Sequence, residues 1–300
     1  MEVFKLNTEQ MELVKDGLGF VVALDQSKAD MPRVLRLYSY SDDDYDTDEE
    51  MYELVATAYR RVITCSAFNA ERIIACILPE QLIDKKIDDK YMTDYLWDEK
   101  KITPCIKLET ELDELKDGVQ LIKEIPNLDE RLKKLADRNI FAVKISSMIK
   151  NDNEEGIEKI VAQQMELARK ILDYGMVPIL EPEIFFRAEN KEDADYTLSS
   201  TLKRAFKELG EDDKVCLSIM LPEEEDNYYS FTKNPNVLRT MAICAAIPRG
   251  IAVSRLSKNR KVVSGFNRAF LEGISGNMDD KMFNIMISDV VASFAKASNS

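Results

Sequence analysis

The chain contains no histidine among its 300 residues. This absence excludes Ser-His-Asp and Cys-His catalysis, zinc or iron sites with histidine ligands, and every proton transfer that uses an imidazole. Any chemistry must therefore use lysine, arginine, aspartate, glutamate, tyrosine, serine or cysteine side chains.

Cysteine is scarce as well, with five residues that never form a Cys-x-x-Cys pair. An odd, dispersed set disfavours a disulfide framework and a zinc site. Four of the five, Cys76, Cys105, Cys216 and Cys244, lie in apolar runs typical of strands. We expect small buried thiols there, and neither a metal nor a cofactor.

Positive charge is in deficit, because 41 lysines and arginines face 55 acidic residues, a net charge of −14. Such a surface repels nucleic-acid phosphates and anionic lipids, although a locally positive pocket for a small phosphorylated sugar or related metabolite is compatible with it. No apolar run approaches the ~18 residues that span a bilayer, and the start Met1–Leu6 does not resemble a signal peptide. We therefore expect a cytoplasmic protein without nucleic-acid or membrane partners; a homo-oligomer remains open.

Short apolar runs alternate with longer amphipathic stretches along the whole chain. The helical patterns cover Glu49–Ile63, Glu154–Tyr174, Leu198–Leu209 and Asp279–Ala297. Eight short runs, apolar at successive positions, are typical of strands buried on both faces. These runs are Gly19–Asp25, Arg72–Leu78, Thr103–Lys107, Ile140–Ile145, Met176–Glu181, Lys214–Met220, Val237–Cys244 and Val262–Phe266. The alternation predicts a single-domain (β/α)₈ TIM barrel over residues 1–300.

One acidic stretch, Asp42–Glu50, has the composition of a metal loop. It lacks the glycine that a calcium loop needs. A solvated loop followed by a helix with Thr47 or Asp48 as its N-cap is the favoured interpretation.

Charged residues gather at the expected ends of the strands. Asp25 ends the first run, Lys107 the third, Lys144 the fourth, and Glu181 with Glu183 the fifth. Each alone is as consistent with a structural ion pair as with a site. Together they favour a site at the barrel mouth, because burying so many charges otherwise costs several kcal/mol.

Five segments, in order, carry a resemblance to a known family. They are Gly19–Ser27, Gly118–Lys123, Ile140–Lys144, Val177–Glu183 and Phe266–Phe270. The set resembles successive motifs of the short bacterial class I fructose-bisphosphate aldolases, with the family's spacing, from about residue 19 to about residue 294. The resemblance implies a carbon–carbon lyase, in which a lysine on the sixth strand forms an imine with a ketose carbonyl.

The resemblance also implies catalytic roles. Asp25 would contact substrate hydroxyls and assist cleavage of the carbon–carbon bond. Lys144 would bind phosphate or polarise substrate oxygens. Glu181 and Glu183 would move protons during imine formation and cleavage.

Three further residues are implied in substrate binding. Lys107 would bind phosphate or polarise substrate oxygens, Arg268 would bind a phosphate, and Ser27 belongs to the substrate-binding set.

The chain departs from the family pattern at four places. Ser218 stands where the resemblance places the imine-forming lysine, and a hydroxyl cannot form an imine. Ser146 replaces an arginine, and Lys28–Pro32 replaces Gly-Gly-Ser-Thr-Pro. Cys244–Ala246 replaces a Ser-Gly-Gly segment whose amides cradle a phosphate, and the alanine methyls obstruct close approach.

Three functions follow as alternatives. The first is an aldolase-like protein that has lost, or strongly reduced, cleavage of fructose 1,6-bisphosphate to dihydroxyacetone phosphate and glyceraldehyde 3-phosphate. The second is an active or redirected Schiff-base lyase that uses Lys144. The third is a non-imine barrel enzyme in which Asp25, Glu181 and Glu183 transfer protons. With three carboxylates nearby, we expect Lys144 to stay charged.

Overall fold

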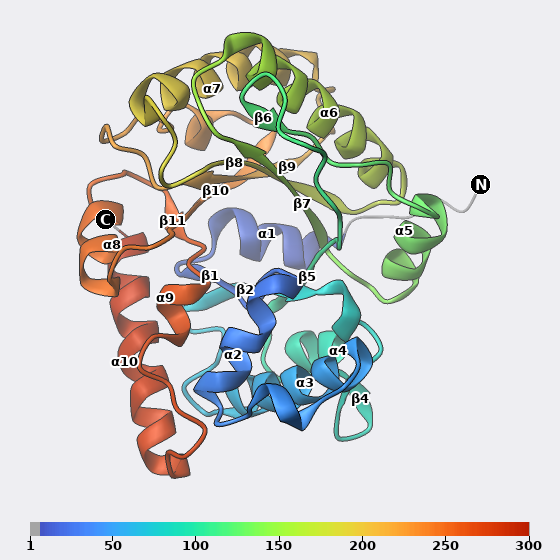
Figure 1. Cartoon of the computed structure of the whole chain (residues 1–300), viewed down its shortest axis with the longest axis vertical. Helices are drawn as coiled ribbons and strands as arrows, with labels where there is room; N and C mark the ends of the chain where they lie inside the picture. Colours follow the sequence, from blue (N-terminus) through green and yellow to red (C-terminus); the bar gives the residue numbers. More distant parts are fainter. Residues whose placement is uncertain (1–6, 300) are drawn as a thin grey trace.

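Eight parallel strands form the centre of the molecule, in a computed structural model that describes residues 7–299. In chain order they are β1 (Phe20–Ala23), β2 (Ile73–Pro79), β5 (Thr103–Lys107), β7 (Ala142–Ile149), β8 (Val177–Ile184), β9 (Val215–Met220), β10 (Val237–Ile243) and β11 (Val263–Ser264). Each strand pairs with the next one named, and β11 lies beside β1. The sheet thus curls into a nearly closed barrel (Figure 1), and the (β/α)₈ prediction is confirmed.

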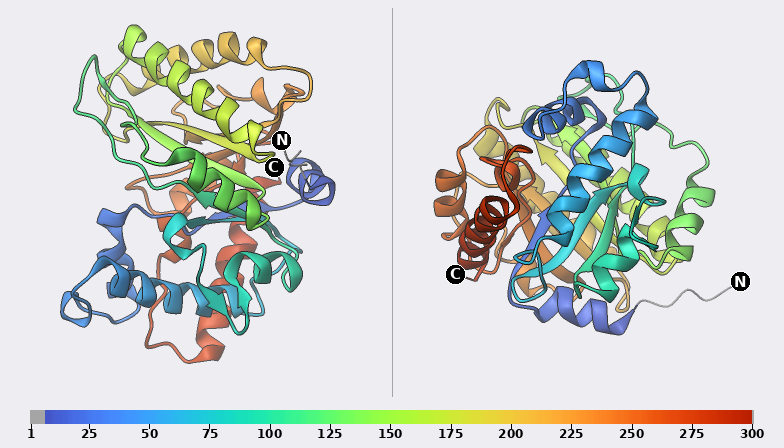
Figure 2. Two further views of the ribbon diagram at one scale, coloured as in Figure 1. Left: turned by 90° about the vertical axis from the view of Figure 1, so that its right-hand side faces the viewer. Right: turned by 90° about the horizontal axis from the view of Figure 1, so that it is seen from below.

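Helices surround the strands, as the views in Figure 2 show. They are α2 (Met31–Leu37), α3 (Asp48–Thr64), α4 (Met92–Asp98), α5 (Leu128–Asp137), α6 (Glu154–Asp173), α7 (Lys191–Ala205), α8 (Arg249–Leu256), α9 (Arg268–Leu271) and α10 (Asp280–Ser298). A loop with a single 3₁₀ turn, Phe231–Lys233, connects β9 to β10. The apolar faces of the helices pack on the barrel to form one continuous core.

A further helix, α1 (Thr8–Asp16), packs against β2, β5 and β10 at the amino-terminal end of the barrel. Arg239 of β10 donates hydrogen bonds to the carbonyls of Val14, Lys15 and Gly17, at 2.7, 2.7 and 3.0 Å. These contacts cover that end, so the open mouth lies at the carboxyl ends of the strands.

Two short strand pairs complete the sheets. β6 (Val119–Gln120) pairs antiparallel with the end of β7, and β3 (Lys86–Ile87) forms a hairpin with β4 (Lys90–Tyr91). The contact with β6 supports a longer β7 than the apolar pattern predicted.

All eight predicted strands are present, but several of their ends were placed wrongly. β7 continues to Ile149 and β8 to Ile184, so Lys144 and Glu181 lie inside strands rather than at their ends. Both strands continue through these polar residues, because the residues pair in register across the sheet. Ser146 of β7, for example, pairs with Glu181 of β8. Asp25 instead follows the end of β1 by two residues.

The helices follow the prediction with one shift. α7 begins at Lys191, earlier than the predicted start at Leu198, because its first turns are polar. Thr47 caps α3, as expected, and its hydroxyl accepts a hydrogen bond from the backbone of Glu50 at 3.2 Å. Cys76, Cys105, Cys216 and Cys244 are buried free thiols, as predicted, although Cys244 lies just beyond β10. Within residues 7–299, every helix is too short or too polar to cross a lipid bilayer.

Gly19 sets the start of β1, and its replacement by alanine tests this packing. Its φ is +149°, and an added Cβ would lie 2.3 Å from the carbonyl oxygen of Arg72. We expect Gly19→Ala to lower the free energy of unfolding in urea by about 2–4 kcal/mol. Gly250→Ala in α8 is the matched control, since nothing lies within 4 Å of its Cβ position. A Gly19→Ala protein as stable as the wild type would contradict this account.

Candidate active site

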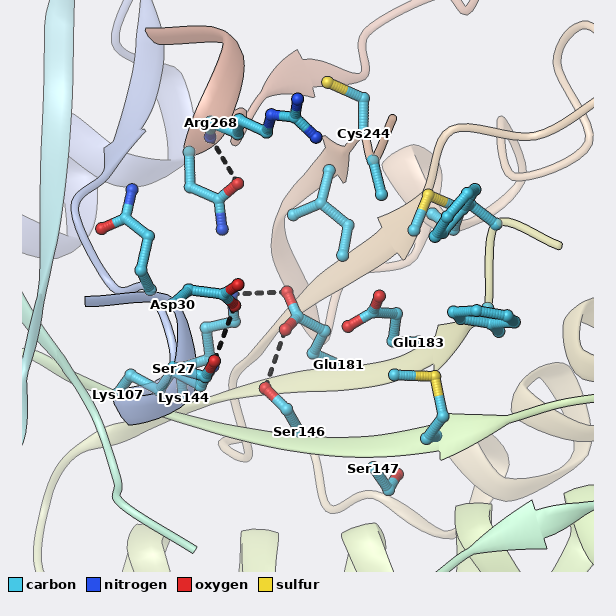
Figure 3. A pocket seen from close by; sticks show the side chains of 18 of the residues that line it. Ser27, Asp30, Lys107, Lys144, Ser146, Ser147, Glu181, Glu183, Cys244 and Arg268 are labelled. Carbon is cyan, nitrogen blue, oxygen red and sulfur yellow. Dashed lines mark hydrogen bonds and ion pairs between the residues drawn. The ribbon is translucent and has the colours of Figure 1, made fainter. Parts of the chain in front are cut away.

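A cavity of about 680 Å³ opens at the carboxyl ends of the barrel strands. Six of the eight residues to which the sequence assigns a catalytic or binding role line it: Ser27, Lys107, Lys144, Glu181, Glu183 and Arg268. Asp25 and Ser218 are fully buried beside the cavity floor, where they contact Lys144 and Glu181. The structure therefore brings the whole predicted set together at one mouth. Figure 3 shows the six that line the cavity.

Lys144 lies between two carboxylates on the cavity floor. Its Nζ is 2.7 Å from Oδ2 of Asp25 and 2.5 Å from Oε2 of Glu181. The Lys144 side chain is only 2% exposed, and the two acids are equally buried. This triad links β7, β8 and the segment after β1 in a place that water hardly reaches.

The two carboxylates decide the charge of Lys144. Burial alone lowers the pKa of its ammonium, but the charges of Asp25 and Glu181 outweigh burial and raise the pKa above its ordinary value. Burial likewise raises the pKa of Asp25, and Lys144 and Lys107 outweigh it, so the pKa of Asp25 is lowered. Lys144 is therefore an ammonium ion at neutral pH, as expected from the sequence.

Glu181 accepts two further hydrogen bonds. The hydroxyl of Ser146, on β7, donates to Oε1 at 2.7 Å, and the hydroxyl of Ser218, on β9, donates to Oε2 at 2.6 Å. Two serines on the strands that flank β8 thus share one carboxylate with the ammonium of Lys144. Both carboxylate oxygens of Glu181 therefore accept hydrogen bonds.

Glu183 differs from its neighbour, because its carboxyl has no hydrogen-bond partner or ion pair among residues 7–299. It faces the cavity beside Glu181 (Figure 3). Burial, followed by the negative charge of Glu181, raises the pKa of Glu183 to about 7. Glu183 is thus a carboxyl that exchanges a proton near neutral pH.

The three residues assigned to substrate binding lie at the rim. Lys107 ends β5, and its Nζ donates to the backbone carbonyl of Asp25 at 3.4 Å. Ser27 donates its hydroxyl to Oδ2 of Asp30 at 2.7 Å. Arg268 begins α9 and is exposed at the mouth.

Sequence reasoning missed several cavity residues. Phe185 and Phe186 form part of an apolar wall, and Asp30 and Arg33 line the rim. The two phenylalanines directly follow β8, so their place after a strand end could have marked them. Asp30 lies within Lys28–Pro32, which departs from the family pattern but was not assigned to the site, and Arg33 carried no such signal, because it belongs to the helix after β1.

The segment Cys244–Ala246 forms another part of the cavity wall. Ala246 has φ +58°, the left-handed region in which a Cβ is unfavourable and glycine is preferred. Burial, with a smaller contribution from Glu272, raises the pKa of the Cys244 thiol to about 12. Cys244 is therefore a neutral wall residue rather than a nucleophile.

No cluster of three or more metal-ligating side chains occurs in the described part of the chain. The acidic residues after Ser41 form a 3₁₀ turn, Asp42–Asp44, with a capping box of its own.

Replacing Glu183 with glutamine tests the proton equilibrium at this carboxyl. A raised pKa means that the folded state binds more protons between pH 4.5 and about 7 than the unfolded state does. The contribution of Glu183 to the free energy of unfolding therefore falls as pH rises through this window, by up to about 3 kcal/mol. We expect Glu183→Gln to gain stability relative to the wild type between pH 5 and pH 8.

Urea unfolding at several pH values provides the measurement, with the exposed Glu124→Gln as the control. A constant difference between Glu183→Gln and the wild type from pH 5 to 8 would show that Glu183 titrates normally.

The similarity of this chain to known proteins points to one family. The model of the family described as "Fructose-bisphosphate aldolase class-I" matches residues 5–223. The curated "Fructose-bisphosphate aldolase class 1" of Clostridium acetobutylicum is 38% identical over 293 residues, 98% of this chain and 99% of the relative. A solved Plasmodium falciparum fructose-bisphosphate aldolase, bound to TRAP and a small-molecule inhibitor, shares the fold at 14% identity and a TM-score of 0.74, covering 98% of this chain and 96% of that one. This chain belongs to the class I fructose-bisphosphate aldolase family.

Proposed function

We propose that this barrel has lost the imine chemistry of its family and binds a small phosphorylated sugar or related metabolite without cleaving it at an ordinary enzyme rate. On this proposal, residues 1–300 form one aldolase-like domain. The observation that carries it is Ser218, the residue that the family resemblance places at the imine-forming position. It is completely buried, and its hydroxyl is bonded to Glu181.

The chemistry of serine supports this proposal. An imine requires a nitrogen that loses two protons as it replaces the carbonyl oxygen, and a hydroxyl oxygen can form only a single bond to that carbon. Without the iminium, no electron sink stabilises the carbanion formed when the C3–C4 bond breaks.

Lys144 is a poor substitute for the missing nucleophile. An amine attacks a carbonyl only with a free electron pair, and the pKa of Lys144 is raised by two carboxylates in contact with it. If its nitrogen moved to a substrate, Asp25 and Glu181 would lose their shared cation in a buried place, at a cost of several kcal/mol. These contacts disfavour a redirected lyase that uses Lys144.

Changes at the phosphate contacts point in the same direction. Ser146 stands at the position of a family arginine and donates its hydroxyl to Glu181. Ala246 occupies a backbone conformation that glycine adopts more readily. Both features weaken the grip that would hold a bisphosphate for reaction.

Borohydride trapping tests the loss of the imine. The chain is mixed with dihydroxyacetone phosphate, reduced with borohydride, and mapped by peptide mass spectrometry. We expect no lysine adduct, whereas the Clostridium acetobutylicum relative serves as the positive control. An adduct on Lys144 or Lys107, or cleavage of fructose 1,6-bisphosphate at about 1 s⁻¹ or faster, would overturn the proposal.

One observation favours a second candidate, a proton-transfer enzyme that uses no imine. Glu183 faces the cavity with an unpartnered carboxyl and a pKa of about 7, close to the optimum for a general base at neutral pH. Such an enzyme would exchange the protons on a carbon next to a carbonyl. The test is deuterium uptake by dihydroxyacetone phosphate in D₂O, followed by NMR. Uptake that Glu183→Gln abolishes supports this candidate, and wild-type uptake no faster than buffer removes it.

Restoring an amine at position 218 gives a further prediction. We expect Ser218→Lys to form a borohydride-trappable adduct with dihydroxyacetone phosphate, because Glu181, Glu183 and Lys144 surround the site. Turnover of fructose 1,6-bisphosphate should stay poor, since holding the carbonyl against the amine is worth about 7–11 kcal/mol of the barrier and the phosphate contacts remain altered.

Ser218→Met is the matched control, since it adds a comparable chain without the amine. Circular dichroism and thermal unfolding establish that both variants are folded. A folded Ser218→Lys protein that never forms an adduct would show that residue 218 does not stand at the imine-forming position.

A further inference from the structure

The inner faces of β7 and β8 change from polar to apolar toward the mouth of the cavity. Side chains two positions apart on a strand point to the same side. Residues at this spacing line the cavity: Lys144, Ser146 and Met148 on β7, Glu181 and Glu183 on β8, and Phe185 directly after β8. Charged and hydroxyl groups therefore lie toward the floor, and Met148 and Phe185 lie above them.

The next two strands also end in apolar residues. β9 ends at Met220 and β10 at Ile243, and both residues line the cavity. β7, β8, β9 and β10 are neighbours in the sheet, in this order. Together with Phe186, their ends form the apolar wall, which consists of Met148, Phe185, Phe186, Met220 and Ile243. The charged rim residues described above lie on other elements, so a ligand meets charge at one part of the mouth and hydrocarbon at another.

Two cations hold the aromatic rings of the apolar wall. The Nζ atom of Lys150 lies 3.9 Å from the centroid of the Phe185 ring, and the guanidinium carbon of Arg187 lies 5.0 Å from that of Phe186. The two ring centroids are 4.8 Å apart, with the rings tilted by 57°. Both phenylalanines and Met148 are only half-buried. The apolar wall is thus preformed and presents hydrocarbon to the cavity.

A ligand with a hydroxyl on every carbon does not match the apolar wall. A hydroxyl pressed against hydrocarbon loses water without gaining a hydrogen bond. Polar partners on this side are already engaged: Ser146 donates its hydroxyl to Glu181 at 2.7 Å. Ser147 is almost fully buried, and its hydroxyl accepts a hydrogen bond from Gln164 at 2.6 Å. Hydrocarbon, in contrast, is stabilised here, because both it and the wall leave water.

We propose that the cavity takes a phosphorylated metabolite that carries a compact apolar group, a branched alkyl chain or a hydrocarbon ring, in place of the hydroxylated chain of a sugar. The apolar group packs on the apolar wall. The inference rests on the proposed function, binding of a small phosphorylated metabolite without cleavage, and names the chemistry of that ligand. The cavity, about 680 Å³ in volume, has room for such a group beside a phosphate.

Calorimetric titration with two matched probes tests this preference. Cyclohexyl phosphate and myo-inositol 1-phosphate share the ring size and the phosphate, and they differ only in the ring hydroxyls. The contacts of the phosphate are common to both probes and cancel in the comparison. We expect cyclohexyl phosphate to bind at least about tenfold more tightly than myo-inositol 1-phosphate, at one pH and ionic strength.

Two variants assign the preference to the apolar wall. Met148→Gln keeps the length of the side chain and replaces the thioether with an amide, and Phe185→Gln removes a ring. Each should weaken cyclohexyl phosphate by at least about threefold and leave myo-inositol 1-phosphate within about twofold of the wild type. Met282→Gln is the matched control, since Met282 is exposed on α10, outside the cavity. Circular dichroism and thermal unfolding establish which variants are folded.

Equal affinity for the two probes, tighter binding of myo-inositol 1-phosphate, or binding of neither would overturn the inference. So would a preference that a folded cavity variant leaves unchanged, or that Met282→Gln reduces equally. Fructose 1,6-bisphosphate serves as a third probe. If it binds and cyclohexyl phosphate does not, only this inference fails and the proposed binding of a phosphorylated sugar stands. If cyclohexyl phosphate is preferred but borohydride traps a lysine adduct, only the proposed loss of imine chemistry fails.

Discussion

The contact of the Lys144 ammonium with two buried carboxylates is the constraint on which the rest of the site depends. An ammonium ion inside a barrel is stable only when opposite charges replace the water that it has lost. Asp25 and Glu181 provide this replacement, from two different parts of the barrel. The same contact that keeps the barrel floor intact also withholds the electron pair that an attacking amine would need. Stability and loss of nucleophilicity therefore have one physical cause.

The two serines complete this arrangement through Glu181. Ser146 and Ser218 lie on strands either side of β8, and each donates a short hydrogen bond to a different oxygen of the same carboxylate. A neutral hydroxyl satisfies an acceptor without changing the charge of the floor, whereas a cation at either position would add charge to it. The two departures from the family pattern are thus coupled, because both positions meet the same acceptor.

Much of the fold and site follows from local sequence patterns. Buried strands are marked by apolar runs, so all eight were found, and Lys107 ends β5 as predicted. The pattern failed where tertiary pairing decided the outcome: β7 and β8 continue through polar residues because each residue pairs with one on the next strand. The place of Asp30 depends on a 3₁₀ turn after β1, and the raised pKa of Glu183 depends on burial beside Glu181. Neither property is encoded in spacing along the chain.

The paired charges of the floor leave discrimination among ligands to the rim. The barrel interior cannot attract an anion strongly while Lys144 is offset by Asp25 and Glu181. The attraction must come from side chains whose charges are not already matched, and at the mouth of this cavity the guanidinium groups of Arg33 and Arg268, which form no ion pair among residues 7–299, are in that position. A barrel that keeps its buried cation paired can therefore change the ligand that it binds through single rim residues, while its strands and floor stay as they are. Because the rim residues are exposed, such changes add little to the cost of folding, in contrast to any change at Lys144.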